Sequence, residues 1–285
     1  MTMRKRVYIA LAVLLIAVVG AIAWQVLRLR EPVYQGRRLS VWLEILHREK
    51  RAHLDARAKQ AIRHIGTNAL PVLIERLRAH DTPLKQLIMK WAQKQAFVNF
   101  HFNSADERRP EAIWGYEALG PLASAQVPSL GATLTNDPSP EVRIAAAWAL
   151  GYIGPEARMA APALFRATQD KDYHVRSPAF VALGKIRPNP QLTIPLLVDG
   201  LDDPHLTVRA DAAFALGNYG TQAKAAIPTL LRMLATNNAV VFEHDTNVFA
   251  LYAITAGNAA GFEKDVVGSA LKKIDPEAAA KAGVK

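Results

Sequence analysis

The sequence predicts an all-α protein, a right-handed α-α solenoid that follows one N-terminal transmembrane helix. Two observations lead to this prediction. One pattern of residues occurs three times at a fixed spacing, marked by Asp137, Asp170 and Asp203, and a fixed period of this size is typical of repeat architectures. The second observation is an apolar segment without charged residues close to the N-terminus.

The chain of 285 residues divides into five parts. The apolar segment and the repeated pattern set the main boundaries, and changes in charge and periodicity set the others. The parts are a basic N-terminal tail at 1–6, a transmembrane anchor at 7–27, a juxtamembrane linker and helix at 28–54, the repeat array at 55–275, and a C-terminal polar tail or cap at 276–285.

Seven positions define the repeated pattern. Apolar residues within each copy are spaced i, i+4, i+7, i+8 and i+11, which places them on one face of a helix. We expect two helices per copy, the second with Pro162, Pro195 or Pro228 in its first turn, where a missing N–H costs no hydrogen bond. The first clean copy contains Asp137, Val142, Arg143, Ala149, Leu150, Gly151 and Pro162, and the same residue types recur from Asp170 to Pro195 and from Asp203 to Pro228.

Weaker copies flank the three clean ones. Ala118-Leu119-Gly120 matches the Ala-Leu-Gly triplet of a preceding copy. After residue 234 we expect a first helix over 248–254, its second helix over 262–274, and a short capping helix that starts at Asp275-Pro276. Before the array, Ser40 is expected to be the N-cap of a helix.

The pattern D-x-x-x-x-V-R…A-L-G-x-[IY]…P resembles the HEAT repeat, in a form similar to the phycobilin-lyase-type HEAT-like repeat of bacteria. The resemblance implies a superhelix of helix pairs whose second helices line the concave face. An anchor followed by such an array is similar to bacterial membrane-anchored HEAT-repeat proteins. The resemblance is strong over 137–235, fair over 110–136, and weak over 55–100 and 236–275.

The segment from Val7 to Leu27 predicts a membrane anchor. It has 21 residues and no charge, enough to cross a hydrocarbon core of roughly 30 Å as a helix. Basic residues stand on both sides, and Trp24 suits an interface. The alternatives are a signal peptide cleaved after Ala21-Ile22-Ala23 and, less favoured, a buried core helix. The short basic tail favours a single-pass protein of a bacterial inner membrane, with the repeats on the extracytoplasmic side.

The net charge of +10 is concentrated beside the anchor. Residues 1–30 carry a net charge of +5 and residues 31–110 carry +7, whereas residues 111–285 carry −2. The array is therefore nearly neutral, and nucleic acid, which needs basic side chains along a phosphate path, is not the expected partner. The basic segment 47–63 is interpreted as a solvated helix face, or alternatively as a contact with anionic lipid head groups.

An acidic and a basic residue stand six positions apart in every clean copy. One interpretation is a row of ligands. The favoured one is a structural ladder, in which each Asp caps a helix N-terminus and pairs with an Arg of its own or a neighbouring copy. The ladder residues are Asp137, Arg143, Asp170, Arg176, Asp203 and Arg209.

No pattern of residues predicts catalysis. The chain has no cysteine, which excludes disulfides, thiolate metal sites and a Cys nucleophile. Metal-dependent hydroxylases built from HEAT-like repeats carry paired His-Glu dipeptides, which this sequence lacks. Glu243-His244-Asp245 lacks a second His at helical spacing. We expect no metal, no cofactor and no enzymatic activity. The eight histidines are His47, His53, His64, His80, His101, His174, His205 and His244.

A group of aromatic residues interrupts the repeat rhythm between 91 and 116. Core packing at the junction between irregular and regular copies is the favoured interpretation, and a patch that binds a peptide or glycan is the alternative. The possible partner patch comprises Trp91, Phe97, Phe100, His101, Phe102, Trp114 and Tyr116.

These observations predict a membrane-anchored scaffold that binds another protein over several repeats, without a reaction. One alternative from a different class is an enzyme or enzyme subunit of the HEAT-like lyase type. A second is a membrane-proximal protein that binds nucleic acid. Residues where the period fails, rather than the ladder, are expected to give this chain its specificity.

Overall fold

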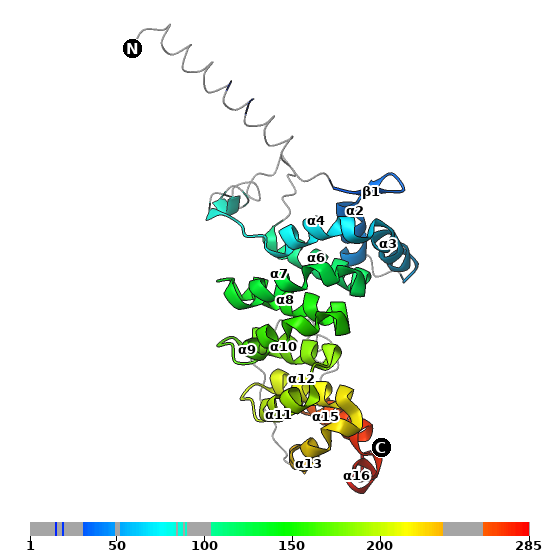
Figure 1. The fold of residues 1–285 in the computed structure, drawn as a ribbon, viewed down its shortest axis with the longest axis vertical. Coiled ribbons are helices and arrows are strands. Elements are labelled where there is room, and N and C mark those ends of the chain that lie inside the picture. Colours follow the sequence, from blue (N-terminus) through cyan, green and yellow to red (C-terminus); the bar gives the residue numbers. More distant parts are fainter. Residues whose placement is uncertain are drawn as a thin grey trace, which may run out of the picture.

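The computed structural model describes residues 31–48, 52–83, 104–235 and 259–284, together with a few positions between 15 and 89. The described residues form a column of stacked helices (Figure 1). The predicted anchor at 7–27 lies outside them, apart from Leu15 and Val19. Among the residues that are described, no helix has the length and apolar character needed to cross a membrane.

The N-terminal end of the column begins with a hairpin that the sequence did not predict. Strands β1 (Val33–Tyr34) and β2 (Arg37–Arg38) pair antiparallel. Gln35 and Gly36 between them have φ angles of 49° and 73°, as a two-residue hairpin turn requires. Helices α2 (Leu39–Arg48), α3 (Ala52–Ile65) and α4 (Leu70–Leu77) follow, with the 3₁₀ helix η1 (Gly66–Ala69) between the last two.

The prediction that Ser40 is the N-cap of α2 is wrong, because the helix starts one residue earlier. Helix α2 already includes Leu39, whose N–H donates to the carbonyl of Pro32, while the Ser40 N–H donates to the Glu31 carboxylate over 3.2 Å. An acidic side chain from before the hairpin therefore stabilises this helix start. The expected array boundary at residue 55 falls within α3.

Within the described ranges, four helix pairs make up the regular part of the array. A 3₁₀ helix joins the two members of three pairs. The pairs are α6 (Ala105–Leu119), η2 (Gly120–Gln126) and α7 (Val127–Asn136); α8 (Pro140–Ile153), η3 (Gly154–Ala160) and α9 (Ala161–Ala167); α10 (Tyr173–Ile186) and α11 (Pro190–Gly200); and α12 (Leu206–Tyr219), η4 (Gly220–Ala226) and α13 (Ile227–Ala235).

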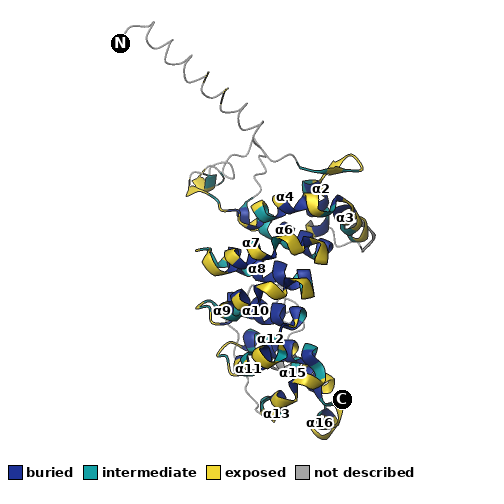
Figure 2. Ribbon diagram, in the orientation of Figure 1, coloured by how far each residue is buried: buried dark blue, intermediate teal, exposed yellow. Residues whose placement is uncertain are grey.

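The first helices pack directly on one another through glycine. A Cβ added at Gly184 would lie 2.6 Å from Ala215 Cα, and one at Gly151 would lie 3.2 Å from Ala182 Cα. The Ala-Leu-Gly triplet therefore allows close approach of consecutive helices. The apolar face of each first helix is buried between neighbours (Figure 2), with Val142, Leu150, Leu183 and Leu216 completely buried.

The C-terminal end differs from the expected arrangement. The sequence assigned 262–274 to a second helix, but α15 (Ala259–Ile274) packs on α12 as the next first helix. A Cβ at Gly217 would lie 3.1 Å from Ala270 Cα, which repeats the glycine contact of the earlier copies. Helix α16 (Pro276–Lys281) then closes the column with Asp275 as its N-cap. The predicted first helix at 248–254 lies outside the described residues.

The second clean copy departs from the other two between its helices. Gly154 and Gly220 end the neighbouring first helices with φ angles of 79° and 55°, but Arg187 occupies the equivalent position and takes the left-handed conformation at φ 48°, ψ 62°. The copy then has no 3₁₀ helix, and α11 begins early with Asn189 as its N-cap. Pro195, expected in a first turn, therefore lies inside α11.

Candidate partner-binding face

The ladder residues join consecutive copies. Arg143 donates from Nε and a terminal nitrogen to the carboxylate of Asp170, over 2.9 and 3.0 Å. Arg176 makes the same two bonds to Asp203, over 2.8 and 2.9 Å. Each Arg also donates to the backbone carbonyl of the Asp in its own copy, over 3.0 Å. These are bidentate pairs with charged partners, which are the strong kind of side-chain hydrogen bond.

The expected capping role of the ladder aspartates is corrected in one respect. The N-caps of α8 and α10 are Ser139 and Asp172, not Asp137 and Asp170. Each ladder Asp accepts from the N–H two residues later, as in Ser139 N–H to Asp137 over 3.0 Å. It therefore shapes the turn just before the helix, and the residue it holds provides the cap.

Each Arg of the ladder and its Asp partner in the next copy form one rung, and the third rung is only partly within the described structure. Arg209 donates to the carbonyls of Asp203 and Pro204, both over 3.0 Å. The position that would supply its acidic partner is Thr236, which lies outside the described residues. At the other end, His80 Nε2 lies 3.7 Å from the carboxylate of Asp137. The ladder side chains thus contact the protein itself and are not arranged to hold a ligand.

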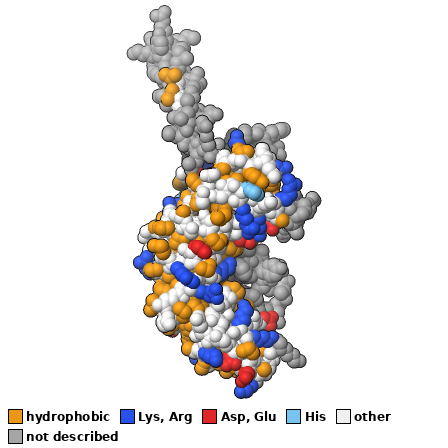
Figure 3. All heavy atoms as spheres, turned by 45° about the vertical axis from the view of Figure 1, so that its right-hand side comes forward, with side chains coloured by type: hydrophobic (Ala, Val, Ile, Leu, Met, Phe, Trp, Pro, Cys, Tyr) orange, Lys and Arg blue, Asp and Glu red, His pale blue; other side chains and the backbone are white. Residues whose placement is uncertain are grey.

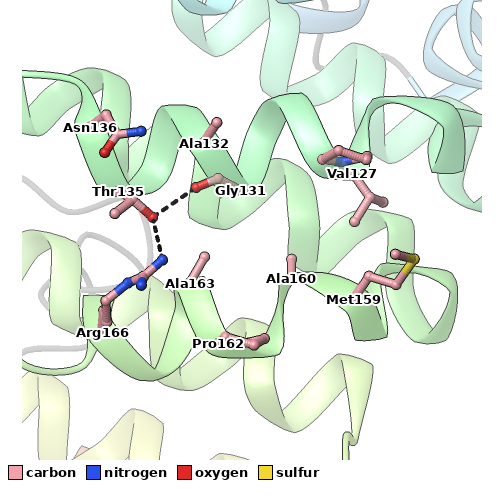
Figure 4. A pocket seen from close by; sticks show the side chains of 11 residues that line it. Val127, Gly131, Ala132, Thr135, Asn136, Met159, Ala160, Pro162, Ala163 and Arg166 are labelled. Atoms are coloured by element: carbon pink, nitrogen blue, oxygen red, sulfur yellow. Dashed lines mark hydrogen bonds between the residues drawn. The ribbon is translucent and has the colours of Figure 1, made fainter.

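A groove lies between the second helices α7 and α9 (Figure 4). Its volume is about 400 Å³, and small side chains line it because Gly131, Ala160 and Ala163 form the surface where the helices meet. A Cβ at Gly131 would lie 3.8 Å from the Ala163 Cβ, so these positions still have room. At one end of the groove, Arg166 donates to Thr135 Oγ1 over 3.4 Å.

Two large apolar side chains are exposed at equivalent sequence positions of adjacent copies, and one of them, Met159, lines this groove. Met159 is 83% exposed and Leu192 is 63% exposed. Each stands three residues before the repeat proline of its copy, Pro162 or Pro195, and both prolines are exposed as well. In the other regular copies this position is Ala. A single exposed apolar residue is ordinary, and here two occur at the same position of adjacent copies.

Charges along the second helices do not form a basic track. Four residues after each proline the chain reads Glu75, Ala132, Arg166, Asp199 and Arg232. Arg232 pairs with Asp202 over 2.7 Å. On the face shown in Figure 3, Lys and Arg side chains form separate groups among apolar and uncharged ones. A protein that follows a phosphate backbone needs basic side chains in succession, and the series after the prolines alternates in charge instead.

The layer of first helices has a lysine packed on aromatic rings. Lys185 Nζ lies 4.2 Å from the ring centre of Tyr152 and 5.9 Å from that of Trp148. Burial lowers the pKa of Lys185, an effect that the Glu117 carboxylate opposes. Burial, with a further contribution from Glu117, raises the pKa of Tyr152 to about 12. Lys185 thus lies over the two rings in the arrangement of a cation–π contact within the first-helix layer.

The possible partner patch in the aromatic region is not assembled by the described residues. Tyr116 is completely buried, and its hydroxyl is hydrogen-bonded to Gln126. Trp114 is partly buried against the core. Tyr116 therefore belongs to the core rather than to a surface, and Gln126 in turn donates to the carbonyl of Leu70 at the start of α4. Trp91, Phe97, Phe100, His101 and Phe102 lie outside the described residues.

Two basic side chains of the segment 47–63 make contacts within the protein. Lys59 pairs with Glu117 over 3.2 Å and with Asp55 over 3.6 Å. Arg63 Nε donates to the carbonyl of Ala118 over 2.8 Å. Both side chains thus help to dock α3 on α6, which leaves Arg57 among the exposed cations of this helix.

The described residues contain no group of three His, Asp or Glu side chains that could hold a metal ion. His174 and His205 instead stack on Tyr173, with ring centres 4.0 and 3.7 Å apart. Glu243-His244-Asp245 lies outside the described residues. The stacked rings fill the turns between copies.

The comparisons with known proteins identify the repeat type. A family model of HEAT repeats matches residues 127–217, and a model of the PBS lyase HEAT-like repeat matches residues 208–236. Residues 127–236 therefore match models of HEAT-like repeats. None of the curated proteins compared with it matches.

Two solved structures resemble the chain at low similarity. One is the complex of CpcE and CpcF of phycocyanin lyase from Nostoc sp. PCC7120, with 19% identity, a TM-score of 0.40, and coverage of 88% of this chain and 95% of that chain. The other is the crystal structure of an engineered protein, with 19% identity, a TM-score of 0.38, and coverage of 81% and 97%. At this level they carry no argument about function.

The sequence reasoning missed the exposed pair Met159 and Leu192. The signal was available, since both occupy the same position of the repeat, where the flanking copies have Ala. It was overlooked because apolar residues in a repeat are normally attributed to the core. The groove could not be foreseen, because its room depends on how closely α7 approaches α9.

Proposed function

We propose that this HEAT-like array binds a segment of another protein along its second-helix face. The single observation that supports this is the pair Met159 and Leu192, both exposed at the same position of adjacent copies, with Met159 in the lining of the groove between α7 and α9. Covering one such side chain contributes about 1.5–3 kcal/mol. Two such side chains and a groove lined by small residues together offer apolar area for contact with a protein segment.

The test uses the full-length protein in detergent micelles. A random peptide library displayed on phage is selected against it, and the recovered peptides are measured by fluorescence anisotropy. The double variant Met159→Ser and Leu192→Ser should weaken binding about tenfold or more, since it removes apolar contact area. Leu122→Ser is the matched control, because Leu122 is 48% exposed but lies on η2 at a different position of the repeat.

The outcomes of this binding test either support or overturn the proposal. Loss of binding in the double variant, with Leu122→Ser unchanged, supports the proposal. Equal binding by the double variant and the wild type would overturn it, and so would a selection that recovers no peptide above empty micelles.

A second candidate is a role as an enzyme or enzyme subunit of the lyase type. What favours it is the match of residues 208–236 to the PBS lyase HEAT-like repeat. Titration with a linear tetrapyrrole tests it, because a bound chromophore changes its visible absorption. A saturable spectral change that is lost on unfolding supports this candidate, and spectra identical to those of free tetrapyrrole contradict it.

We further propose that residues 7–27 anchor the array in a bacterial inner membrane, with the repeats on the extracytoplasmic side. The support is the uncharged run of 21 residues flanked by basic ones. Membranes washed with alkaline carbonate should retain the protein, and protease added outside spheroplasts should digest the repeats. Release by carbonate, or an N-terminus found by mass spectrometry after Ala23, would contradict the anchor.

A further inference from the structure

A polar notch lies where the second clean copy departs from the repeat, between helices α10 and α11. Because Arg187 replaces the glycine and no 3₁₀ helix follows, the chain leaves an opening of about 410 Å³ between η3 and η4. Its lining comprises Arg158, Arg187, Pro188, Asn189, Pro190, Tyr219 and Gln222.

Two guanidinium groups occupy this notch without an anionic partner in the part of the chain that the structure describes. Among the residues described, neither Arg158 nor Arg187 has an ion pair or a side-chain hydrogen bond, whereas Arg143 and Arg176 have bidentate ones. The side chains of Asn189 and Gln222 add amide donors to the same lining. The Tyr219 hydroxyl is already committed to the carbonyl of Pro188, over 3.2 Å. The free donors therefore outnumber the free acceptors, and the notch is suited to an anion.

The backbone at Arg187 strengthens this interpretation. Its φ of 48° is one that a residue with a side chain rarely adopts, and the neighbouring copies use glycine there. The fold nevertheless places a long cation at this position, directed into the same notch as Arg158.

The notch adjoins the apolar surface that carries the proposed function. Arg158 directly precedes the exposed Met159 on η3, and Leu192 follows Asn189 within the first turn of α11. A chain that covers Met159 and Leu192 therefore passes beside both guanidinium groups. Lys224, at the position equivalent to Arg158, and Glu156 are exposed on η4 and η3.

We propose that the notch between Arg158 and Arg187 receives an acidic side chain of the partner segment, whose apolar residues cover Met159 and Leu192. This inference rests on the proposed function and specifies its partner as a segment that combines apolar residues with a nearby Asp or Glu. A planar carboxylate matches the fork of donors that a guanidinium presents.

The phage selection described above supplies the probes. The recovered peptides should be enriched in Asp or Glu next to Leu, Met or aromatic residues. For a representative peptide, Arg158→Gln and Arg187→Asn should each weaken binding about tenfold or more, as expected for a lost hydrogen bond between charged groups. Asn is chosen at 187 because it tolerates the left-handed conformation. Lys224→Gln removes a charge outside the notch and serves as the matched control.

A peptide in which Gln replaces the acidic residue gives the reciprocal measurement. It should bind the wild type about as weakly as the acidic peptide binds the double Arg variant, and the Arg changes should not weaken it further. Binding of the acidic peptide should also decline with added salt, and this dependence should be smaller in the double variant.

The outcomes distinguish the two proposals. Peptides without acidic enrichment, or binding that Met159→Ser and Leu192→Ser weaken but the Arg changes do not, would overturn the notch and leave the proposed function in place. Binding that neither set of changes affects would overturn both. A loss as large for Lys224→Gln as for Arg158→Gln would also overturn the notch, because general attraction would then explain the effect.

Discussion

Arg143 and Asp170 belong to consecutive copies, and two hydrogen bonds join their side chains across the boundary between these copies. The same Arg bonds to the carbonyl of Asp137, which lies in its own copy. One side chain thus fixes the turn before its own helix and the turn of the next copy. The constant period of the repeat follows from these two contacts as much as from helix packing.

Removing one partner of this pair should destabilise the array. Both side chains are largely buried, with 10% and 15% of their surface exposed, so Asp170→Asn or Arg143→Gln should lower the free energy of unfolding by about 2–4 kcal/mol. Urea unfolding followed by circular dichroism measures the loss. The surface pair Arg232 and Asp202 is the control, since its removal should cost under about 1 kcal/mol. Equal losses at the two pairs would contradict the assigned role of the ladder.

Two glycines should respond oppositely to alanine. At Gly184 a Cβ would lie 2.6 Å from the Ala215 backbone, so Gly184→Ala should separate α10 from α12 and cost about 1–3 kcal/mol. At Gly131 the nearest atom is 3.8 Å away, so Gly131→Ala should stabilise α7 by about 0.5–1 kcal/mol. Thermal unfolding of both variants checks the contrast. A stable Gly184→Ala variant would show that the first helices can slide apart at little cost.

The stability of the protein should depend on which side chain replaces Arg187. Val at this position is β-branched and disfavours a φ of 48°, so Arg187→Val should destabilise the protein by about 1 kcal/mol or more relative to Arg187→Asn. Both variants remove the same charge, so the difference reports the backbone alone. Identical midpoints in urea would mean that the turn after α10 relaxes to another conformation.

Asp172 should contribute to acid sensitivity. Burial raises its pKa, but hydrogen bonds from the His174 N–H and imidazole outweigh that effect and leave the pKa lowered. A carboxyl whose pKa falls on folding stabilises the protein above its unfolded pKa of about 4, and this contribution disappears as the pH falls through the folded value. Asp172→Asn should lower the melting temperature at pH 6 and reduce its further decrease at pH 3. The exposed Asp202→Asn is the control, and a steeper acid decrease in Asp172→Asn would refute the assignment.

The sequence predicted the regular copies well because their determinants are local. The spacing of Val142, Ala149 and Leu150 specifies an apolar helix face, and the HEAT resemblance rests on those positions. Pro195 was expected in a first turn because proline is compatible with that position. Helix α11 instead starts earlier, at Asn189-Pro190, after Arg187 has taken the place of the glycine found in the neighbouring copies. Helix α15 was assigned to the wrong layer because an amphipathic pattern does not state which neighbour covers it. Met159 and Leu192 required knowledge of exposure, which periodicity does not give.

The ladder has a direction, since Arg143 and Arg176 each bond to the Asp of the copy that follows. A copy inserted in tandem would supply an Asp for the Arg before it and an Arg for the Asp after it, so no rung would lose its partner. The array can therefore change its length by whole copies, and with it the number of second helices that face a partner, without redesign of any existing junction. A deletion of any other length between the Arg and the Asp of a rung would change the spacing on which that rung depends.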